Sequence, residues 1–213
     1  MKIRPYRAED RDAVRRICFE TGLLGEPVGA QFSDQEAFAD LITRYYTDQE
    51  PESCFVGELE GKVVGYMLGT LDARRVPAAE RVMARLAFTR HLGLRPGTAR
   101  FFWRGIGDSV RMTLRGEQLA SADLDAYPAH THFSLLPEAR HTPLGVGLYR
   151  SFFVLAKKQG CPGLHGEVFV ENVRATKLHE AMGFQRQGAP VFAPALRGPS
   201  GEDLHVQLWV RKL

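Results

Sequence analysis

Apolar residues recur along this chain with two periods, and each period marks a different kind of element. Alternating or unbroken apolar runs bounded by Gly, Pro or charged residues predict strands over residues 2–6, 54–59, 63–71, 129–136, 166–170, 185–192 and 204–210. A spacing of three or four residues predicts helices beginning near residues 9, 36, 145 and 172. For the second of these helices, Ser33 and Glu36 have the spacing of a capping box.

The stretch from residue 127 to residue 184 organises the rest of the chain. The strand over 129–136 is stopped by Pro137, and after a turn Gly145 and Gly147 open a helix that ends at Gly160. The strand over 166–170 follows, and then a helix from residue 172 to residue 183. Two strands joined through a helical crossover should lie parallel in one sheet. We therefore expect a mixed α/β (α+β) fold.

The turn before the first of these helices reads RHTPLGVG, residues 140–147. A helix N-terminus carries unpaired N–H groups and the positive end of the helix dipole, which suit an anion such as phosphate. A plain tight turn explains the same residues, and the pattern alone leaves both interpretations open.

Residues 72–126 separate the third expected strand from the fourth, and this segment is too long for a structureless loop. Helical spacing of Val82 with Leu86, and of Phe102, Ile106 and Val110, predicts a helical insertion. Residues 72–117 hold ten Arg against four acidic residues, a net charge of +6 in a chain whose total is +3. These arginines either solvate the outer face of two helices or form a basic wall that attracts an acidic ligand.

Length and composition restrict the class of protein. A chain of 213 residues fits one domain over residues 1–213, with 72–126 inserted in it. Cys18, Cys54 and Cys161 are odd in number and lack C-x-x-C spacing, so the sequence predicts neither a disulfide framework nor a metal site. The sequence shows no signal peptide, no apolar run of membrane-spanning length and no nucleic-acid-binding motif. We expect a cytoplasmic protein that binds neither membrane nor nucleic acid, and leave monomer and homodimer open.

The motifs resemble those of the GCN5-related (GNAT) N-acetyltransferases. Their Q/R-x-x-G-x-G/A motif, after a strand that ends near Pro, is matched by Leu135, Pro137, Arg140 and Gly145. Their N-x-x-A-x-x-L-Y-x-x-x-G-F motif is matched by the following set: Asn172, Ala175, Leu178, Gly183 and Phe184. The strand YPAHTHFSLLPE further resembles a bacterial subgroup related to the acetyltransferase-like domain of O-GlcNAcase. The resemblance implies the GNAT fold: a mostly antiparallel sheet that splays between two central parallel strands, with helices on both faces.

The same resemblance implies an acetyl-CoA-dependent N-acetyltransferase. Such an enzyme acts on a primary amine of a small molecule or peptide, through a ternary complex. The residues that it places at acetyl-CoA are Leu135, Leu136, Arg140, His141, Thr142, Leu144, Gly145, Val146, Gly147 and Asn172. At the first motif glycine stands Pro143, which has no N–H, and at the motif tyrosine, which protonates the departing thiolate, stands His179.

Three histidines are candidates for proton transfer. His179 takes the tyrosine position, where it is either the acid or a buried structural histidine. His130 and His132 lie two apart on one strand and so share a face, and their ordinary pKa suits a general base. Paired structural histidines explain them equally well, and no third ligand accompanies them to favour zinc. The alternative function is a catalytically weakened GNAT-fold binding module that binds a partner through the basic insertion.

Overall fold

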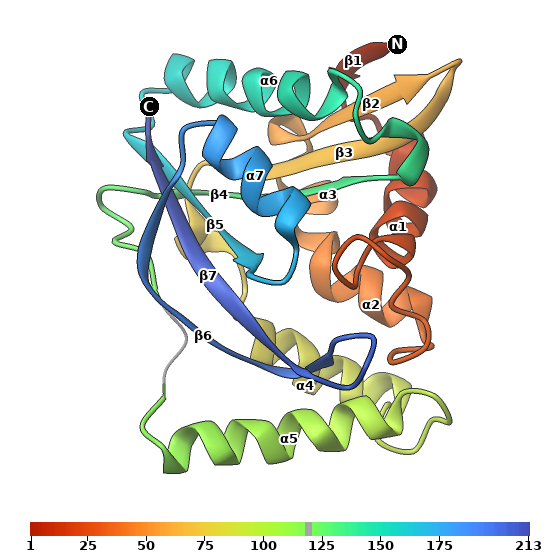
Figure 1. Cartoon of the computed structure of the whole chain (residues 1–213). Helices are drawn as coiled ribbons and strands as arrows, with labels where there is room; N and C mark the ends of the chain where they lie inside the picture. The colour runs from red at the N-terminus through yellow and green to blue at the C-terminus, as the bar shows by residue number, and fades with distance from the viewer. Residues whose placement is uncertain (118–120) are drawn as a thin grey trace.

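The computed structural model describes residues 1–117 and 121–213, and its strands form one seven-stranded sheet (Figure 1). Their order across the sheet is β1-β2-β3-β4-β5-β7-β6. The bounds are β1 Lys2–Pro5, β2 Phe55–Leu59, β3 Lys62–Thr70, β4 Ala129–Leu135, β5 Gly163–Phe169, β6 Gln185–Arg197 and β7 Asp203–Lys212. All neighbouring strands are antiparallel except β4 and β5, which are parallel. The predicted mixed sheet with two central parallel strands is confirmed.

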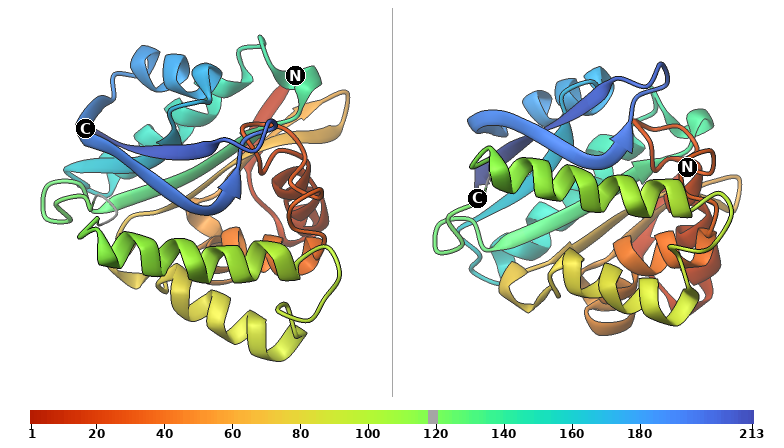
Figure 2. Two further views of the ribbon diagram at one scale, coloured as in Figure 1. Left: turned by 60° about the horizontal axis from the view of Figure 1, so that its bottom comes forward. Right: turned by 90° about the horizontal axis from the view of Figure 1, so that it is seen from below.

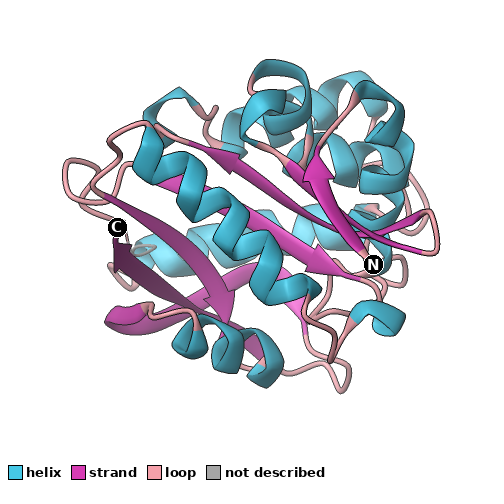
Figure 3. Ribbon diagram, turned by 90° about the horizontal axis from the view of Figure 1, so that it is seen from above, coloured by secondary structure: helices cyan, strands magenta, loops and turns pink. Residues whose placement is uncertain are grey.

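Helices cover both faces of the sheet. Helices α1 (Arg11–Glu20), α2 (Gln35–Ile42) and α3 (Arg44–Gln49) lie on one face, which we call the inner face. Helices α6 (Leu144–Lys158) and α7 (Val173–Ala181) lie on the other, the outer face, and α6 lies along the strands there (Figure 3). Short 3-10 turns complete the set at Ala8–Asp10, Pro51–Ser53, Ala73–Arg75 and Pro137–Ala139.

Two apolar cores follow from the alternation of side chains along the central strands. The inner core joins Tyr66 and Leu68 of β3 to Val14 and Ile17 of α1. The outer core joins β5 and β7 to α6 and α7, and among its fully buried side chains are Leu148, Phe152 and Leu164. Each face of β4 and β5 is therefore fixed by a separate set of packed side chains.

Two helices, α4 (Ala79–Arg90) and α5 (Ala99–Leu114), lie between β3 and β4 in the chain. Figure 2 shows α5 lying along β6 with α4 beside it. The Phe101 ring of α5 meets Phe32 edge-on, with the centroids 5.0 Å apart. The Asp108 carboxylate accepts hydrogen bonds from the Ala195 N–H and the Arg197 guanidinium, each at 2.9 Å. These contacts attach the inserted helices to the inner face.

Local features depart from the sequence-based prediction at the second helix. Asp34, and not Ser33, caps α2, because its carboxylate accepts from the Ala37 N–H at 3.0 Å. The hydroxyl of Ser33 instead bonds the Pro96 carbonyl and Thr98 of the inserted segment. Within the described residues, no helix is both long and apolar enough to cross a bilayer.

Candidate active site

The two central strands separate soon after they meet. β4 and β5 pair only at Ala129 with Leu164 and at His130 with His165. Beyond these pairs the β4 edge that faces β5 carries no ladder. The Leu136 N–H donates to Val64 of the strand on the other side, at 2.8 Å. Because peptide groups alternate in direction along a strand, those of Phe133 and Leu135 face the gap.

A cavity of about 420 Å³ opens at this gap. Its wall combines the end of β4, the turn before α6, the first turn of α7 and the loop after α1. The lining residues are Thr21, Leu24, Gly25, Phe133, Ser134, Leu135, Arg140, His141, Thr142, Gly145, Val146, Asn172, Arg174, Ala175, Lys177 and Leu178. Seven of the ten residues predicted to hold acetyl-CoA are among them.

Helix α6 directs its N-terminus at the cavity. Pro143 is the N-cap residue, and the Leu144 N–H is bonded to the Thr142 hydroxyl at 3.3 Å. Within the described residues, the N–H groups of Gly145 and Val146 have no protein acceptor, and both residues line the cavity. Unpaired amides at the positive end of a helix dipole are donors for a bound anion. Pro143 itself is not part of the wall, so the missing N–H leaves these two donors in place.

Three cations line the same cavity: Arg140, Arg174 and Lys177. The Glu26 carboxylate, from the loop after α1, bridges two of them, since Oε1 lies 3.2 Å from Nη1 of Arg140 and 3.2 Å from Nη2 of Arg174. Hydrogen bonds from Arg174 and then Arg140 lower the pKa of Glu26. A carboxylate therefore occupies the position where these guanidinium groups could receive a phosphate.

Three predicted cofactor residues are not part of the wall, and the structure gives the reason for each. Leu136 uses its N–H on Val64 and its carbonyl on the Ala139 N–H (3.0 Å), so it has no backbone group for a ligand. Leu144 is fully buried, with its side chain packed beside that of Leu148 against Gly57 of β2. Gly147 donates its N–H to the Pro143 carbonyl, and a Cβ there would overlap Cδ1 of Ile3, so its small size serves packing against β1.

Asn172 lines the cavity and also caps α7. Its Oδ1 accepts from the Ala175 N–H at 3.1 Å, which fixes the side-chain amide at the N-terminus of the helix. The amide nitrogen of Asn172 is then the group that can donate into the cavity.

His179 lies on the outer face, close to the point where the strands separate. Its Nε2 is 3.8 Å from the position that a Cβ on Gly166 would take, and Gly166 follows the last residue of β5 that pairs with β4. Nδ1 bonds the Ala175 carbonyl at 2.9 Å and therefore carries the hydrogen, so Nε2 accepts from the Tyr149 hydroxyl at 3.2 Å. Burial lowers the pKa of His179 to about 4 and raises that of Tyr149. The imidazole is neutral near pH 7, and the proton of the pair is on Tyr149.

His130 and His132 share the inner face, as expected from their spacing. Nδ1 of His130 lies 2.7 Å from the Tyr46 hydroxyl, and Nδ1 of His132 lies 3.2 Å from the Tyr66 hydroxyl. Burial lowers the pKa of His130 to about 3, assisted by His165 and His132, and lowers that of His132 to about 4. Both rings are neutral near pH 7 and are weaker bases than an ordinary histidine.

Glu167 was not predicted as a site residue. His130 pairs with His165, and side chains two residues apart on a strand share a face. Two residues further along each strand, Glu167 therefore lies opposite His132 on the inner face, at the gap. Its carboxylate has no hydrogen-bond donor among residues 1–117 and 121–213, and the side chain reaches solvent. The surrounding protein nevertheless removes enough water to raise the pKa of Glu167. A lone acid in the apolar run GEVFV was the signal in the sequence.

The described residues contain no group of three or more His, Cys, Asp or Glu side chains that could hold a metal ion. The arrangement thus offers an anion cradle, an unpaired strand edge and, across the gap, a carboxylate flanked by neutral histidines.

Solved structures share this architecture over most of their length. SsHAT superposes with a TM-score of 0.72 and 27% identity, covering 99% of this chain and 97% of its own. A GNAT superfamily phosphinothricin acetyltransferase (Pat) from Sinorhizobium meliloti, in complex with AcCoA, gives a TM-score of 0.59 at 18% identity, covering 100% and 88%. A GCN5-related N-acetyltransferase from Kribbella flavida gives 0.59 at 16% identity, covering 100% and 97%. No family model matches the sequence.

Proposed function

We propose that this chain, whose fold is that of the GCN5-related N-acetyltransferases, transfers an acetyl group from acetyl-CoA to a primary amine. The observation that carries the proposal is the cavity at the gap between β4 and β5. Its wall holds an unpaired strand edge beside an unpaired helix N-terminus. A related fold crystallised with AcCoA supports the choice of acetyl donor.

The residues present fit acetyl-CoA in two respects. The amides of Gly145 and Val146, with Arg140 and Arg174, can receive its diphosphate. The backbone of Phe133 and Leu135 can pair with the amides of its pantetheine arm, as an added strand pairs with a sheet edge. Acetyl-CoA supplies an activated thioester, and the chain has to bring an uncharged amine to it.

Glu167 is suited to remove the proton from the amine. An incoming primary amine is protonated near neutral pH, and its ammonium must lose a proton before the nitrogen can attack the thioester carbon. A carboxylate with a raised pKa, reachable from solvent at the gap, can accept that proton. Attack forms the amide bond and breaks the carbon–sulfur bond, which leaves a thiolate to be protonated. The Tyr149 hydroxyl, which bonds His179 Nε2 on the outer face close to the gap, is our candidate for the donor.

The function is tested by adding acetyl-CoA to the full chain in a thermal-denaturation experiment. A ligand that binds only the native state raises the midpoint, by an amount that grows with its concentration. Arg174→Gln should reduce the shift, whereas Arg16→Gln should not, because Arg16 pairs with Glu20 on α1, away from the cavity. A midpoint that acetyl-CoA leaves unchanged would contradict the proposal and favour a binding module without acetyl-CoA.

Glu26→Gln should strengthen binding of acetyl-CoA. The Glu26 carboxylate competes with the diphosphate for Arg140 and Arg174, and removing its charge frees both guanidinium groups. Because Glu26 is exposed, we expect the gain of a surface ion pair, below about 1 kcal/mol or about fivefold in Kd at low salt. Titration calorimetry measures it. Glu20→Gln is the matched control, since Glu20 pairs with Arg16 in a similarly exposed position. Weaker binding by the Glu26 variant would show that the carboxylate belongs to the ligand site.

A further inference from the structure

A short turn after α1 forms part of the wall of the cavity between β4 and β5. Leu23 and Glu26 exchange two backbone hydrogen bonds, at 2.9 and 2.8 Å, which close a hairpin-like loop around Leu24 and Gly25. Both of these tip residues line the cavity. We call residues 23–26 the α1 turn.

The α1 turn lies against two cations of the cavity. The Glu26 carboxylate bridges Arg140 and Arg174. The Gly25 carbonyl accepts a second hydrogen bond from Arg140, through Nη2. The backbone of the turn is also close, because a Cβ on Gly25 would lie 3.2 Å from Nη2 of Arg174 and 3.4 Å from Nη2 of Arg140. A phosphate that binds both guanidinium groups at this position must therefore displace the turn.

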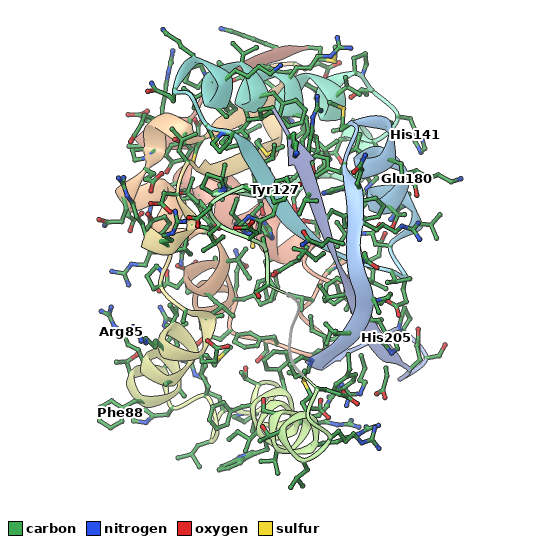
Figure 4. The ribbon with its side chains drawn as sticks, turned by 90° about the vertical axis from the view of Figure 1, so that its left-hand side faces the viewer. Arg85, Phe88, Tyr127, His141, Glu180 and His205 are labelled. Atoms are coloured by element: carbon green, nitrogen blue, oxygen red, sulfur yellow. The ribbon has the colours of Figure 1, made fainter. Side chains whose placement is uncertain are left out.

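Arg140 depends on the α1 turn for its hydrogen bonds. Its side chain is only 14% exposed, and among the described residues its guanidinium has no acceptor other than Glu26 and the Gly25 carbonyl. A largely buried charge without an acceptor is costly, so the turn is held in place until another anion replaces it. A diphosphate offers several charged oxygens to the same guanidinium. It can approach from solvent beside His141, which lines the cavity and projects outward on the side that carries α7 (Figure 4).

The tip of the α1 turn is strained in this position. Leu24 has a φ of 55° and Gly25 a φ of 92°, the combination found in two-residue hairpin turns, where Asn-Gly is preferred. A leucine in the left-handed region is disfavoured, because its Cβ crowds the backbone. The flanks are fixed, since Leu23 is buried in the inner core and the N–H of the fully buried Val28 bonds a carbonyl of α1 at 3.1 Å. Movement is thus confined to the residues between these two, and it relieves the strain at Leu24.

We propose that the α1 turn is a flap over the diphosphate site, which contacts Arg140 and Arg174 in the ligand-free protein and swings away when acetyl-CoA binds. Binding is then an exchange, in which the diphosphate takes the hydrogen bonds of an internal carboxylate and an internal carbonyl. This inference rests on the proposed function for the identity of its ligand. Its test therefore includes inorganic pyrophosphate, which needs the cations but carries no acetyl group.

Gly25→Ala tests the flap through its backbone. An alanine with a φ near 92° opposes the closed turn, and its Cβ crowds both guanidinium groups. Because a flap that swings away carries this strain only in the ligand-free protein, Kd for acetyl-CoA and for pyrophosphate should fall about fivefold. Titration calorimetry measures both constants. A Kd that Gly25→Ala raises or leaves unchanged would overturn the proposal, since a turn that stays in place keeps the strain in both states.

Gly61→Ala is the matched control. Glu60 and Gly61 form the two-residue turn between β2 and β3, also with positive φ values, of 49° and 78°, and neither residue lines the cavity. The substitution introduces the same kind of backbone strain, which ligand binding does not relieve. Its Kd values for both ligands should equal those of wild type.

Hydrogen exchange gives a second test, on the unmodified chain. The Gly25 N–H bonds the Thr21 carbonyl at 3.2 Å, and the Glu26 N–H bonds the Leu23 carbonyl at 2.8 Å. Opening of the flap breaks both bonds, so exchange of residues 23–26 should become faster when pyrophosphate or acetyl-CoA saturates the site. Slower or unchanged exchange there on binding would contradict the flap.

The two ligands separate this inference from the proposed function. If pyrophosphate produces both effects in a chain that acetyl-CoA does not stabilise, the flap stands and the acetyltransferase is contradicted. If acetyl-CoA binds and neither effect follows, the flap is contradicted and the acetyltransferase stands. A chain that binds neither ligand contradicts both.

Discussion

Replacing Glu167 by glutamine is expected to lower turnover by roughly 10²- to 10⁴-fold, the usual contribution of a positioned general base. Glutamine keeps the size of the side chain but cannot take the proton of an ammonium. Glu167 is outside the cavity wall formed by Arg140, Gly145 and their neighbours, so the affinity for acetyl-CoA should stay within about twofold. The measurement is release of CoA thiol with whichever member of a panel of primary amines the wild type acetylates fastest.

The pH profile separates a base from a structural group. Wild-type turnover should rise with pH as the Glu167 carboxyl loses its proton, and burial shifts that rise above the ordinary range for a glutamate. The Gln variant should lack this rise. Glu180→Gln is the control, since Glu180 is exposed on α7 and pairs with Arg186. Full activity in Glu167→Gln would contradict this role and would indicate that His130, His132 or an ordered water is the general base.

Acidification is expected to destabilise the fold well before the carboxylates are titrated. The pKa values of His130, His132 and His179 are about 3, 4 and 4 in the folded chain, against about 6.5 in an unfolded one. Between pH 6.5 and pH 4 the unfolded state therefore binds protons that the folded state refuses, and the free energy of unfolding falls as the pH falls.

The expected size is up to about 2 kcal/mol per histidine between pH 7 and pH 5, hence several kcal/mol for the three together. Glu167, whose pKa is raised, opposes this in part, because its folded form takes up a proton more readily than its unfolded form. Urea denaturation at pH 7 and pH 5 measures the difference. His179→Asn should reduce the loss by one histidine's share, and a stability that does not depend on pH in this window would contradict the three lowered values.

Much of the fold followed from local pattern. The strand predicted over 129–136, the helix predicted to begin near Gly145 and the strand predicted over 166–170 are all present in the structure. Their observed bounds differ from the predicted ones by a few residues. The separation of the two strands was expected only from the family resemblance. The residues of these two strands give no sign that the pairing between β4 and β5 ends at His130.

The site was less predictable, because it depends on which edge of a strand is paired. Leu136 and Phe133 are both apolar residues at the end of β4. Only the bond from Leu136 to Val64 shows that the Leu136 amide is occupied and the Phe133 amide faces the gap. Arg174 and Lys177 look in the sequence like the solvated face of α7, and reach the cavity only because α7 lies beside the α6 N-terminus. The role that we propose for Glu167 depends on the same missing ladder.

The short ladder between β4 and β5 also has a mechanical consequence. The sheet has four strands up to β4 and three from β5 on, and backbone pairing joins these two parts at only two positions. The angle between the two parts is therefore set by few backbone hydrogen bonds. A pantetheine chain bound along the edge of β4 at Phe133 and Leu135 would add hydrogen bonds beyond these two positions. The thioester would then be held by hydrogen bonds that also help to set the angle between the two parts of the sheet.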